Sequence, residues 1–430
     1  KGSMLNLRRY NMKITFHGGA REVGGSCVVV ETDDAKIALD YGIKVGERLP
    51  EHLPKDLDMV IISHAHLDHS GALLSLAKTN TVVVGSEATR DVTADLLLDL
   101  IKVQRMNGNK VPYSYSDVDK IRRLWWARDS VALPGMEIRL YPAGHVLGAK
   151  MINVRAEEKE ILYTGDFCLH NTDILEGSDL ESLPKEPDAL IIESTYGGKK
   201  RLNRSELLER LFMEINETIE RKGNVLIPVF AFHRSQEMAK EIDQAMQDGN
   251  LRNYNTYIIS KLAHKITGHF NRYKELLTEK IREQEKPFNY EYAEYLRRIE
   301  QITEPAIVIC TSGFGHAGVS HRLLKEWAPN EDNSVIISSG YIPPESPLAA
   351  AKEGGELIEN GNKVPIKANV KQIELSSHAD QSELIKLIKT LKPKQTFLVH
   401  GDLEQAQALS KEISQVTHVE IPEKKREIVM

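Results

Sequence analysis

Short runs of apolar residues, each bounded by polar or turn-forming residues, dominate the first half of the chain. Runs of this length are typical of strands buried in a sheet. Several of them end in a polar residue that is followed by Gly or His. Loops at strand ends carry the chemistry of many sheet proteins, so these polar residues are candidates for a functional site. The predicted strands are 13–16, 27–31, 36–40, 59–63, 81–85, 137–141, 151–154, 160–164 and 189–193.

The pattern changes after Gly197. Apolar residues at helical spacing predict a helix over 205–221, with Ser205 as N-cap and Gly223 as C-cap. Alternating strands and helices follow and predict an inserted α/β domain with a parallel sheet. The charged, tyrosine-bearing stretch 270–302 predicts a pair of solvated surface helices. The remaining predicted elements are strands 224–230, 257–260, 306–310, 334–338, 370–375 and 396–399, and helices 235–246, 381–391 and 404–413.

The most informative segment is Ser-His-Ala-His-Leu-Asp-His at 63–69, which follows an apolar strand and precedes a predicted helix. His64 and His66 are two residues apart and can turn to one metal ion, while Asp68 and His69 can reach a second. A single histidine would favour an ordinary polar loop, but four potential ligands within six residues favour a metal site. Imidazole and carboxylate ligands suit zinc, with manganese or iron as alternatives.

Three more candidate ligands follow predicted strands. His145 lies in Ala-Gly-His-Val-Leu-Gly, Asp166 in Thr-Gly-Asp-Phe and His400 in Val-His-Gly-Asp. Taken singly, each is as readily a loop or core residue. The repeated context of a strand, a ligand and a glycine favours a dinuclear site, in which a carboxylate such as Asp166 can bridge two ions.

Together these residues resemble the metallo-β-lactamase superfamily, whose hallmark is His-x-His-x-Asp-His, and more narrowly its β-CASP branch of nucleases. The opening Phe-His-Gly-Gly-Ala-Arg-Glu-Val-Gly-Gly-Ser at 16–26 is similar to archaeal relatives of the cleavage and polyadenylation specificity factor nuclease. Ile-Ile-Glu-Ser-Thr-Tyr-Gly at 191–197 matches the acidic motif of the branch. Ser-Ser-His-Ala-Asp at 376–380 and Val-His-Gly at 399–401 match its C-terminal histidine motifs.

The resemblance implies the fold class α/β, as an αββα sandwich with an inserted β-CASP domain. Residues 1–197 and 368–430 would form the sandwich, and 198–367 the insertion. It also implies two zinc ions, with manganese as an alternative, and Asp40 as a carboxylate that orients a ligand. One ion would take His64, His66, His145 and Asp166, and the other Asp68, His69, Asp166 and His400.

The implied reaction is hydrolysis of a phosphodiester, in which two cations activate a water and polarise the scissile phosphate. His378 would be the general acid and Glu193 its orienting carboxylate; the alternative is that His378 only begins the following helix. Gly-rich turns after strands present backbone N–H groups to phosphates. Ser312, Gly313, His316 and Ser377 are therefore candidate substrate-binding residues, although relatives more often carry another residue where His316 stands.

Among function classes, the resemblance favours a ribonuclease acting on single-stranded RNA, because a histidine at position 400 accompanies RNA enzymes of this branch whereas DNA nucleases tend to carry valine. Endonucleolytic and 5′→3′ exonucleolytic cleavage both remain open. A small-molecule metallohydrolase, such as a thioesterase or lactamase, is the alternative, since the same metal core serves it. A non-catalytic scaffold is disfavoured because all seven expected ligands are present.

Composition changes this picture little. The net charge of −6 argues mildly against a nucleic-acid binder, but bound cations offset acidic ligands and a local groove needs no overall positive charge. No apolar run approaches the ~18 residues of a membrane span. The three cysteines are widely spaced and lack a Cys-x-x-Cys pair, which fits a reducing cytoplasm. The resemblance further implies an archaeal source and a homodimer formed through residues 419–421 and the last residues.

Overall fold

The computed structural model describes residues 12–44, 53–359 and 362–430, which form two compact units. One unit comprises the described residues up to Lys200 together with Ser377–Met430, and the other comprises Arg201–Ser376. Each unit has its own sheets and its own buried core. The chain therefore leaves the first unit after Lys200 and returns to it at Ser377.

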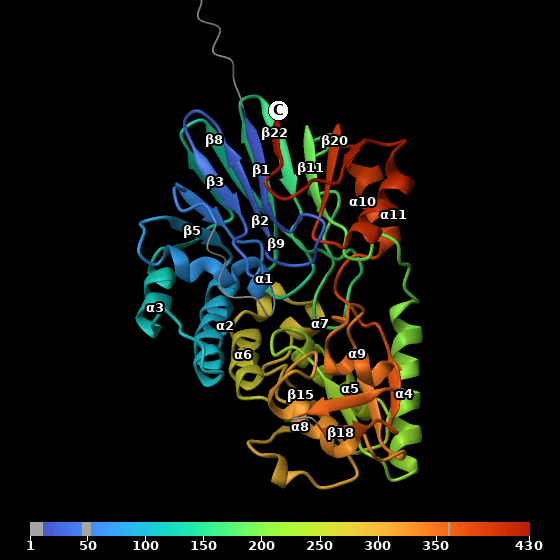
Figure 1. Ribbon diagram of the computed structural model, residues 1–430. Coiled ribbons are helices and arrows are strands. Elements are labelled where there is room, and N and C mark those ends of the chain that lie inside the picture. The colour runs from blue at the N-terminus through green and yellow to red at the C-terminus, as the bar shows by residue number, and fades with distance from the viewer. Residues whose placement is uncertain (1–11, 45–52, 360–361) are drawn as a thin grey trace, which may run out of the picture. The chain divides into compact units, whose positions relative to one another are not determined.

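The first unit contains two seven-stranded sheets (Figure 1). Their order is β22-β1-β2-β3-β4-β5-β6 in one sheet and β21-β20-β11-β10-β9-β8-β7 in the other. The first sheet consists of β1 (Lys13–Gly18), β2 (Cys27–Glu31), β3 (Lys36–Leu39), β4 (Met59–Ile61), β5 (Val82–Gly85), β6 (Trp125–Ala127) and β22 (Glu427–Val429). The second consists of β7 (Ser130–Leu133), β8 (Met136–Pro142), β9 (Lys150–Ala156), β10 (Lys159–Tyr163), β11 (Ala189–Glu193), β20 (Gln395–Val399) and β21 (His418–Glu420).

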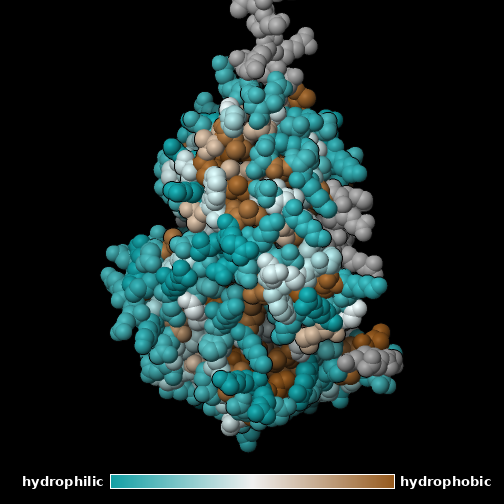
Figure 2. Space-filling view, turned by 90° about the vertical axis from the view of Figure 1, so that its left-hand side faces the viewer, coloured by the Kyte–Doolittle hydropathy of each residue, from teal (hydrophilic) through white to brown (hydrophobic). Residues whose placement is uncertain are grey.

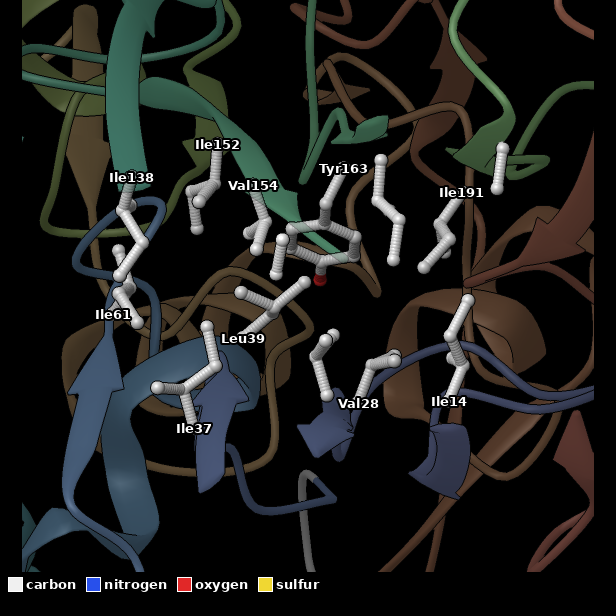
Figure 3. Close-up of a cluster of buried hydrophobic side chains, with 14 of the residues drawn as sticks. Ile14, Val28, Ile37, Leu39, Ile61, Ile138, Ile152, Val154, Tyr163 and Ile191 are labelled. Carbon is white, nitrogen blue, oxygen red and sulfur yellow. The ribbon is translucent and has the colours of Figure 1, made fainter. Parts of the chain in front are cut away.

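The two sheets pack face to face through alternate residues of their strands. Figure 3 shows Ile37 and Leu39 of β3 opposite Ile152 and Val154 of β9, with Tyr163 of β10 beside Val154 and its hydroxyl pointing toward the first sheet. Side chains on one face of a strand are two residues apart, so the intervening residues of the first sheet point away from this core. Those residues, such as Ala38, form a second core with helices.

Helices cover the outer faces of the two sheets and complete an αββα sandwich, as the family resemblance implies. The second core joins the first sheet to α2 (Glu87–Met106) and α3 (Tyr115–Arg123). The other sheet is accompanied by α10 (Gln381–Leu391) and α11 (Leu403–Ile413) beside β20. The short α1 (Leu67–Ser70) and the 3₁₀ helix η1 (Gly71–Leu76) follow the His-rich segment.

The second unit contains a six-stranded sheet in the order β14-β13-β15-β12-β16-β19, and every pairing in it is parallel. This confirms the predicted parallel sheet. The strands are β12 (Val225–Pro228), β13 (Asn255–Ile259), β14 (Ala293–Tyr295), β15 (Ala306–Cys310), β16 (Ser334–Ile337) and β19 (Asn369–Gln372), with a separate hairpin of β17 (Glu356–Glu359) and β18 (Asn362–Pro365). The helical segments are α4 (Arg204–Glu220), α5 (Arg234–Gln247), α6 (Lys261–Arg272), η2 (Lys274–Leu276), α7 (Glu279–Arg282), η3 (Ile299–Gln301), α8 (Gly318–Trp327) and α9 (Pro347–Lys352).

Three expectations for the second unit differ from the structure. Helix α4 is capped by Asn203 rather than Ser205, because the Leu207 N–H donates to the Asn203 carbonyl at 3.1 Å. It ends at Glu220 rather than continuing to a Gly223 cap, because Lys222 takes a positive φ of 66°. The predicted helix pair over 270–302 is wrong: most of this stretch is irregular, and β14 pairs with β13 at the sheet edge.

The return to the first unit also lies later than the predicted residue 368. Strand β19 pairs with β16 in register from Ser334 opposite Asn369 to Ile337 opposite Gln372. Residues that continue the parallel sheet belong to the second unit, which ends at Ser376.

Apolar side chains are mostly buried in the cores of the two units. On the face shown in Figure 2, hydrophilic residues predominate and hydrophobic residues form smaller areas among them. No helix within the described ranges is long and apolar enough to cross a membrane. The two segments predicted to form a dimer contact, β21 and β22, are edge strands of their sheets.

Candidate metal centre

The loop that follows β4 is held close to its neighbours by backbone hydrogen bonds. The Ser26 N–H donates to the Asp68 carbonyl at 2.8 Å, and the Tyr41 N–H donates to the His69 carbonyl at 2.7 Å. A Cβ atom on Gly42 would lie 1.7 Å from the Asp68 carbonyl oxygen, so only glycine allows this approach. The sequence therefore fixes the turn that presents the His-x-His-x-Asp-His ligands.

Three imidazoles form the first ligand group. His64 Nε2 lies 3.1 Å from His66 Nδ1, which lies 3.3 Å from His145 Nε2. Asp68, His69 and His400 form a second group, in which His400 Nε2 lies 3.3 Å from His69 Nε2 and 3.2 Å from Asp68 Oδ2. Both groups have ligand atoms close enough to share one metal ion.

Asp166 lies between the two groups. Its Oδ2 atom is 3.6 Å from His64 Nε2 and 3.3 Å from His69 Nε2, and its Oδ1 atom is 3.3 Å from His400 Nδ1. The side chain is 2% exposed, and among the described residues Oδ1 has no hydrogen-bond partner. A buried carboxylate oxygen without a donor is costly unless a cation balances it. The donor set therefore fits divalent cations.

The protonation of the first ligand group also fits a metal. Burial lowers the pKa of His64 and His145 well below the usual range and lowers the pKa of His66 to about 4, so these rings are neutral. Neutral imidazole is the form that binds metal ions. Burial alone would raise the pKa of Asp166, but His400 and His69 outweigh it and hold that carboxyl ionised.

A buried carboxylate orients His69. Asp40 Oδ2 accepts from His69 Nδ1 at 2.6 Å and from the Tyr163 and Ser63 hydroxyls, both at 2.7 Å, while Oδ1 accepts from the Ser63 N–H at 2.7 Å. His69 thereby turns Nε2 toward Asp166. His145 is held in the same manner by the Ser377 carbonyl, which accepts from Nδ1 at 2.9 Å. Partners of this kind fix the tautomer and orientation of metal ligands.

His378 and Glu193 form a pair next to these ligands. His378 Nδ1 lies 2.9 Å from Glu193 Oε2, and the ring centroids of His378 and His145 are 4.5 Å apart. Glu193 is fully buried at the end of β11, and its Oε1 accepts from the Phe167 N–H at 2.9 Å. The Glu193 carboxylate is thus fixed by the loop that carries Asp166, and it fixes His378 in turn.

Not all predicted substrate-binding residues are in the first unit. Ser377 lies in the first unit, where its carbonyl accepts a hydrogen bond from His145 Nδ1. Ser312, Gly313 and His316 follow β15 in the second unit, where His316 is exposed and a Cβ on Gly313 would lie 2.9 Å from the Phe230 ring. The roles of all four in substrate binding stay predictions.

Sequence reasoning did not find Ser63 and Tyr163 as partners of Asp40. Ser63 directly precedes His64, which is the only local sign of its role. Tyr163 ends β10 among the apolar residues between the sheets, and its hydroxyl reaches Asp40 only because the two sheets pack together. No spacing in the sequence gives that contact.

The αββα sandwich, with ligands at its strand ends, has the architecture of metallo-β-lactamase proteins. Three family models match the chain: the metallo-beta-lactamase superfamily at residues 20–209, the Beta-Casp domain at 235–347 and the Zn-dependent metallo-hydrolase RNA specificity domain at 363–422. A solved structure of a protein of unknown function from Enterococcus faecalis has the same fold, with a TM-score of 0.57 and 15% identity over 98% of this chain and all of that one.

Relatives extend over most of the chain. It is 32% identical to a probable RNase MJ4 of Methanocaldococcus jannaschii, over 93% of this chain and 95% of that protein. It is 30% identical to RNase aCSPSF2 of Saccharolobus solfataricus, over 99% of this chain and 87% of that protein. It is also 30% identical to cleavage and polyadenylation specificity factor 73 of Drosophila melanogaster, but spans only 60% of that protein's length. The chain belongs to the β-CASP family of the metallo-β-lactamase superfamily.

Proposed function

We propose that this protein is a metal-dependent ribonuclease that hydrolyses phosphodiester bonds of single-stranded RNA. The observation that carries the proposal is the convergence of seven ligand residues and the His378–Glu193 pair in one buried site. The match to an RNA specificity domain and the naming of relatives as RNases support RNA as the substrate. A small-molecule hydrolase has no comparable support.

The proposed cofactor is a pair of zinc ions, with manganese as the alternative. His64, His66 and His145 would hold one ion, Asp68, His69 and His400 the other, and Asp166 would bridge them. When bound, two dications supply an activated water and neutralise charge that develops on the scissile phosphate. Asp40 would keep the Nε2 atom of His69 turned toward its ion.

We assign His378 as the general acid. Its Nδ1 atom is paired with Glu193, so the other ring nitrogen, Nε2, would deliver the proton to the leaving ribose oxygen. Glu193 would hold the ring in the tautomer and orientation that this transfer needs. Ser377 would hold His145 in place next to its sequence neighbour His378, because the Ser377 carbonyl accepts a hydrogen bond from His145 Nδ1.

RNA labelled at either end, with a 5′-monophosphate or a 5′-triphosphate, tests the proposal in the presence of zinc or manganese. Mononucleotide release that a triphosphate blocks would identify a 5′→3′ exonuclease. Internal fragments that do not depend on the 5′ end would identify an endonuclease. The Asp68→Ala/His69→Ala double variant is the control, and both activities should disappear in it.

Two outcomes would contradict the proposal. If the metal-loaded protein cleaves neither RNA but hydrolyses a thioester or a lactam, the site serves a small substrate instead. If it cleaves single-stranded DNA and not RNA of the same sequence, the substrate assignment is wrong while the two-metal assignment stands.

A further inference from the structure

A second cluster of metal-binding side chains lies in the first unit. It consists of Cys168 and His170, in the loop after Asp166, and Glu383, in the first turn of α10; we call it the thiol site. Cys168 Sγ lies 3.1 Å from His170 Nδ1, which lies 3.1 Å from Glu383 Oε1. The ligand atoms of this group all lie within 4.8 Å of one another. The His-rich centre uses no cysteine, so the two ligand sets are distinct.

These atoms are close enough to share one ion once the His170 ring turns its Nδ1 edge to the ion, because the sulfur now also lies 3.6 Å from His170 Nε2. Zinc binds sulfur at about 2.3 Å and nitrogen or oxygen at about 2.0 Å, which places neighbouring ligand atoms roughly 3 to 3.6 Å apart. Hydrogen bonds account for part of the cluster, since the Cys168 thiol donates to the His170 carbonyl at 3.5 Å. A single proton on His170 Nδ1 cannot point at both Cys168 Sγ and Glu383 Oε1. Glu383 Oε1 also accepts from the Leu169 and His170 N–H groups, at 3.0 Å and 2.8 Å.

The surroundings of the thiol site favour zinc over harder cations. Cys168 is fully buried, and thiolate with imidazole is a ligand combination that zinc prefers. The His170 side chain is 33% exposed and that of Glu383 is 16% exposed, so solvent can reach the cluster. Three protein ligands and one water complete the usual tetrahedral set.

We propose that Cys168, His170 and Glu383 bind a further divalent cation of the zinc class, with water as the fourth ligand. On binding, the Cys168 thiol releases its proton to solvent and binds as thiolate. His170 binds as the neutral ring through Nδ1, with its proton on Nε2, and Glu383 binds as carboxylate.

The ion would join two segments that carry functional residues. Glu383 Oε2 accepts from the Asp380 N–H at 3.1 Å, and the Ala379 N–H donates to the Phe167 carbonyl at 2.6 Å. The loop after Asp166 is therefore already bonded to the segment that follows His378. A cation on Cys168 and Glu383 adds a further, stronger connection between them. Its role is structural, because it holds these segments in place and takes no part in the cleavage.

Cobalt(II) added to the metal-free full-length protein gives a test that does not depend on any enzyme activity. Thiolate bound to cobalt(II) produces a charge-transfer absorption in the near ultraviolet, which the all-His/Asp centre cannot produce. We expect this absorption to appear in the wild-type protein and to be displaced when zinc is added. The absence of a thiolate band at saturating cobalt would overturn the proposal without any variant.

Variants then assign the band to the thiol site. Cys168→Ser should abolish it and lower the bound zinc by one ion per chain, and His170→Asn should weaken both. Cys310→Ala, which removes another buried cysteine in the second unit, should change neither. Equal zinc content in the wild-type and Cys168→Ser proteins would contradict the proposal. RNA cleavage that persists in Cys168→Ser would show that the ribonuclease proposal is independent of this site.

Discussion

At the residue scale, Asp40 shows how a buried carboxylate can act on the metal centre without binding the metal. It accepts four hydrogen bonds from three residues and is fully buried. Of the two oxygens, Oδ2 receives three donors. If asparagine replaced Asp40, the side-chain amide NH₂ group would face hydrogen-bond donors in either orientation of the amide.

We therefore expect Asp40→Asn to weaken metal binding through His69 by about 10- to 100-fold, as is typical for the loss of a partner that orients a ligand. Metal affinity can be measured by competition with a chromophoric chelator. Asp56→Asn is the matched control, because Asp56 is an exposed aspartate paired with Lys36. If the two variants bind metal equally well, Asp40 does not orient His69.

The assignment of His378 as general acid predicts a loss of activity without a loss of metal. His378→Ala should lower the rate of RNA cleavage by about 10²- to 10⁴-fold, the usual contribution of a general acid, and leave the metal content unchanged. Metal analysis and single-turnover cleavage of the same preparation check both parts. His418→Ala, at the exposed edge strand β21, should change neither. Loss of metal in the His378 variant would make it a ligand and refute its assignment as acid.

Residue identities in the site were predictable where ligands are clustered or stand in a motif. The spacing of the ligands in segment 63–69 alone indicates a metal site. His378 and Glu193 were identified only through the family resemblance. Tyr163 could not be predicted, because its partner Asp40 is 123 residues away on the opposite sheet. Cys168 and His170 stand only two residues apart but outside any ligand-rich segment, and Glu383 reaches them only through the packing of α10, so the sequence did not indicate this cluster.

At the element scale, the turn after β3 decides whether the ligand loop can form. Gly42 has no side chain, and the Asp68 carbonyl oxygen occupies the space that a Cβ atom would need. A methyl group there would have to displace backbone that carries two candidate ligands, Asp68 and His69.

Gly42→Ala should therefore destabilise the protein by about 3 kcal/mol or more and reduce its metal content. Thermal unfolding and metal analysis test this expectation. Gly268→Ala is the matched control, since nothing lies within 4 Å of a Cβ atom there. That glycine is inside α6, where alanine is the better helix former by up to about 1 kcal/mol. A Gly42 variant as stable as the control would mean that the loop adjusts freely.

Elements whose apolar residues recur with a clear period were predicted from the sequence. Elements whose bounds depend on tertiary contacts were not. Apolar runs gave β2, β11 and β15 with the bounds that the structure has. Helix α2 was missed although its N-cap Ser86 accepts from the Thr89 N–H, because buried Thr and Asp residues interrupt its apolar face. Irregular structure within 270–302 was missed because its charge pattern resembles that of an exposed helix, whereas Phe270 and Phe288 are buried.

At the scale of the whole molecule, the candidate ligands come from distant parts of the chain. His69 and His400 are separated by 331 residues, yet their Nε2 atoms lie 3.3 Å apart. All seven candidate ligands nevertheless belong to the first unit, because the chain returns to that unit at Ser377 and adds β20 beside β11. The sequence predicted this return only through the family resemblance, since no local pattern says which sheet a late strand joins.

Metal removal should therefore act on one unit and spare the other. A ligand that binds only the folded state stabilises it by about 2.7 kcal/mol when present at 100 times its dissociation constant. Without the ions, Asp166 also keeps a buried Oδ1 atom that has no hydrogen-bond partner among the described residues, which is unfavourable. We expect a chelator to increase hydrogen exchange in peptides that contain 63–70, 143–148 and 165–170, with no change in β12 and β15 of the second unit. Re-addition of zinc should reverse the effect. Equal deprotection of both units would mean that they unfold as one body, and that the metals stabilise the whole chain rather than the sandwich that holds them.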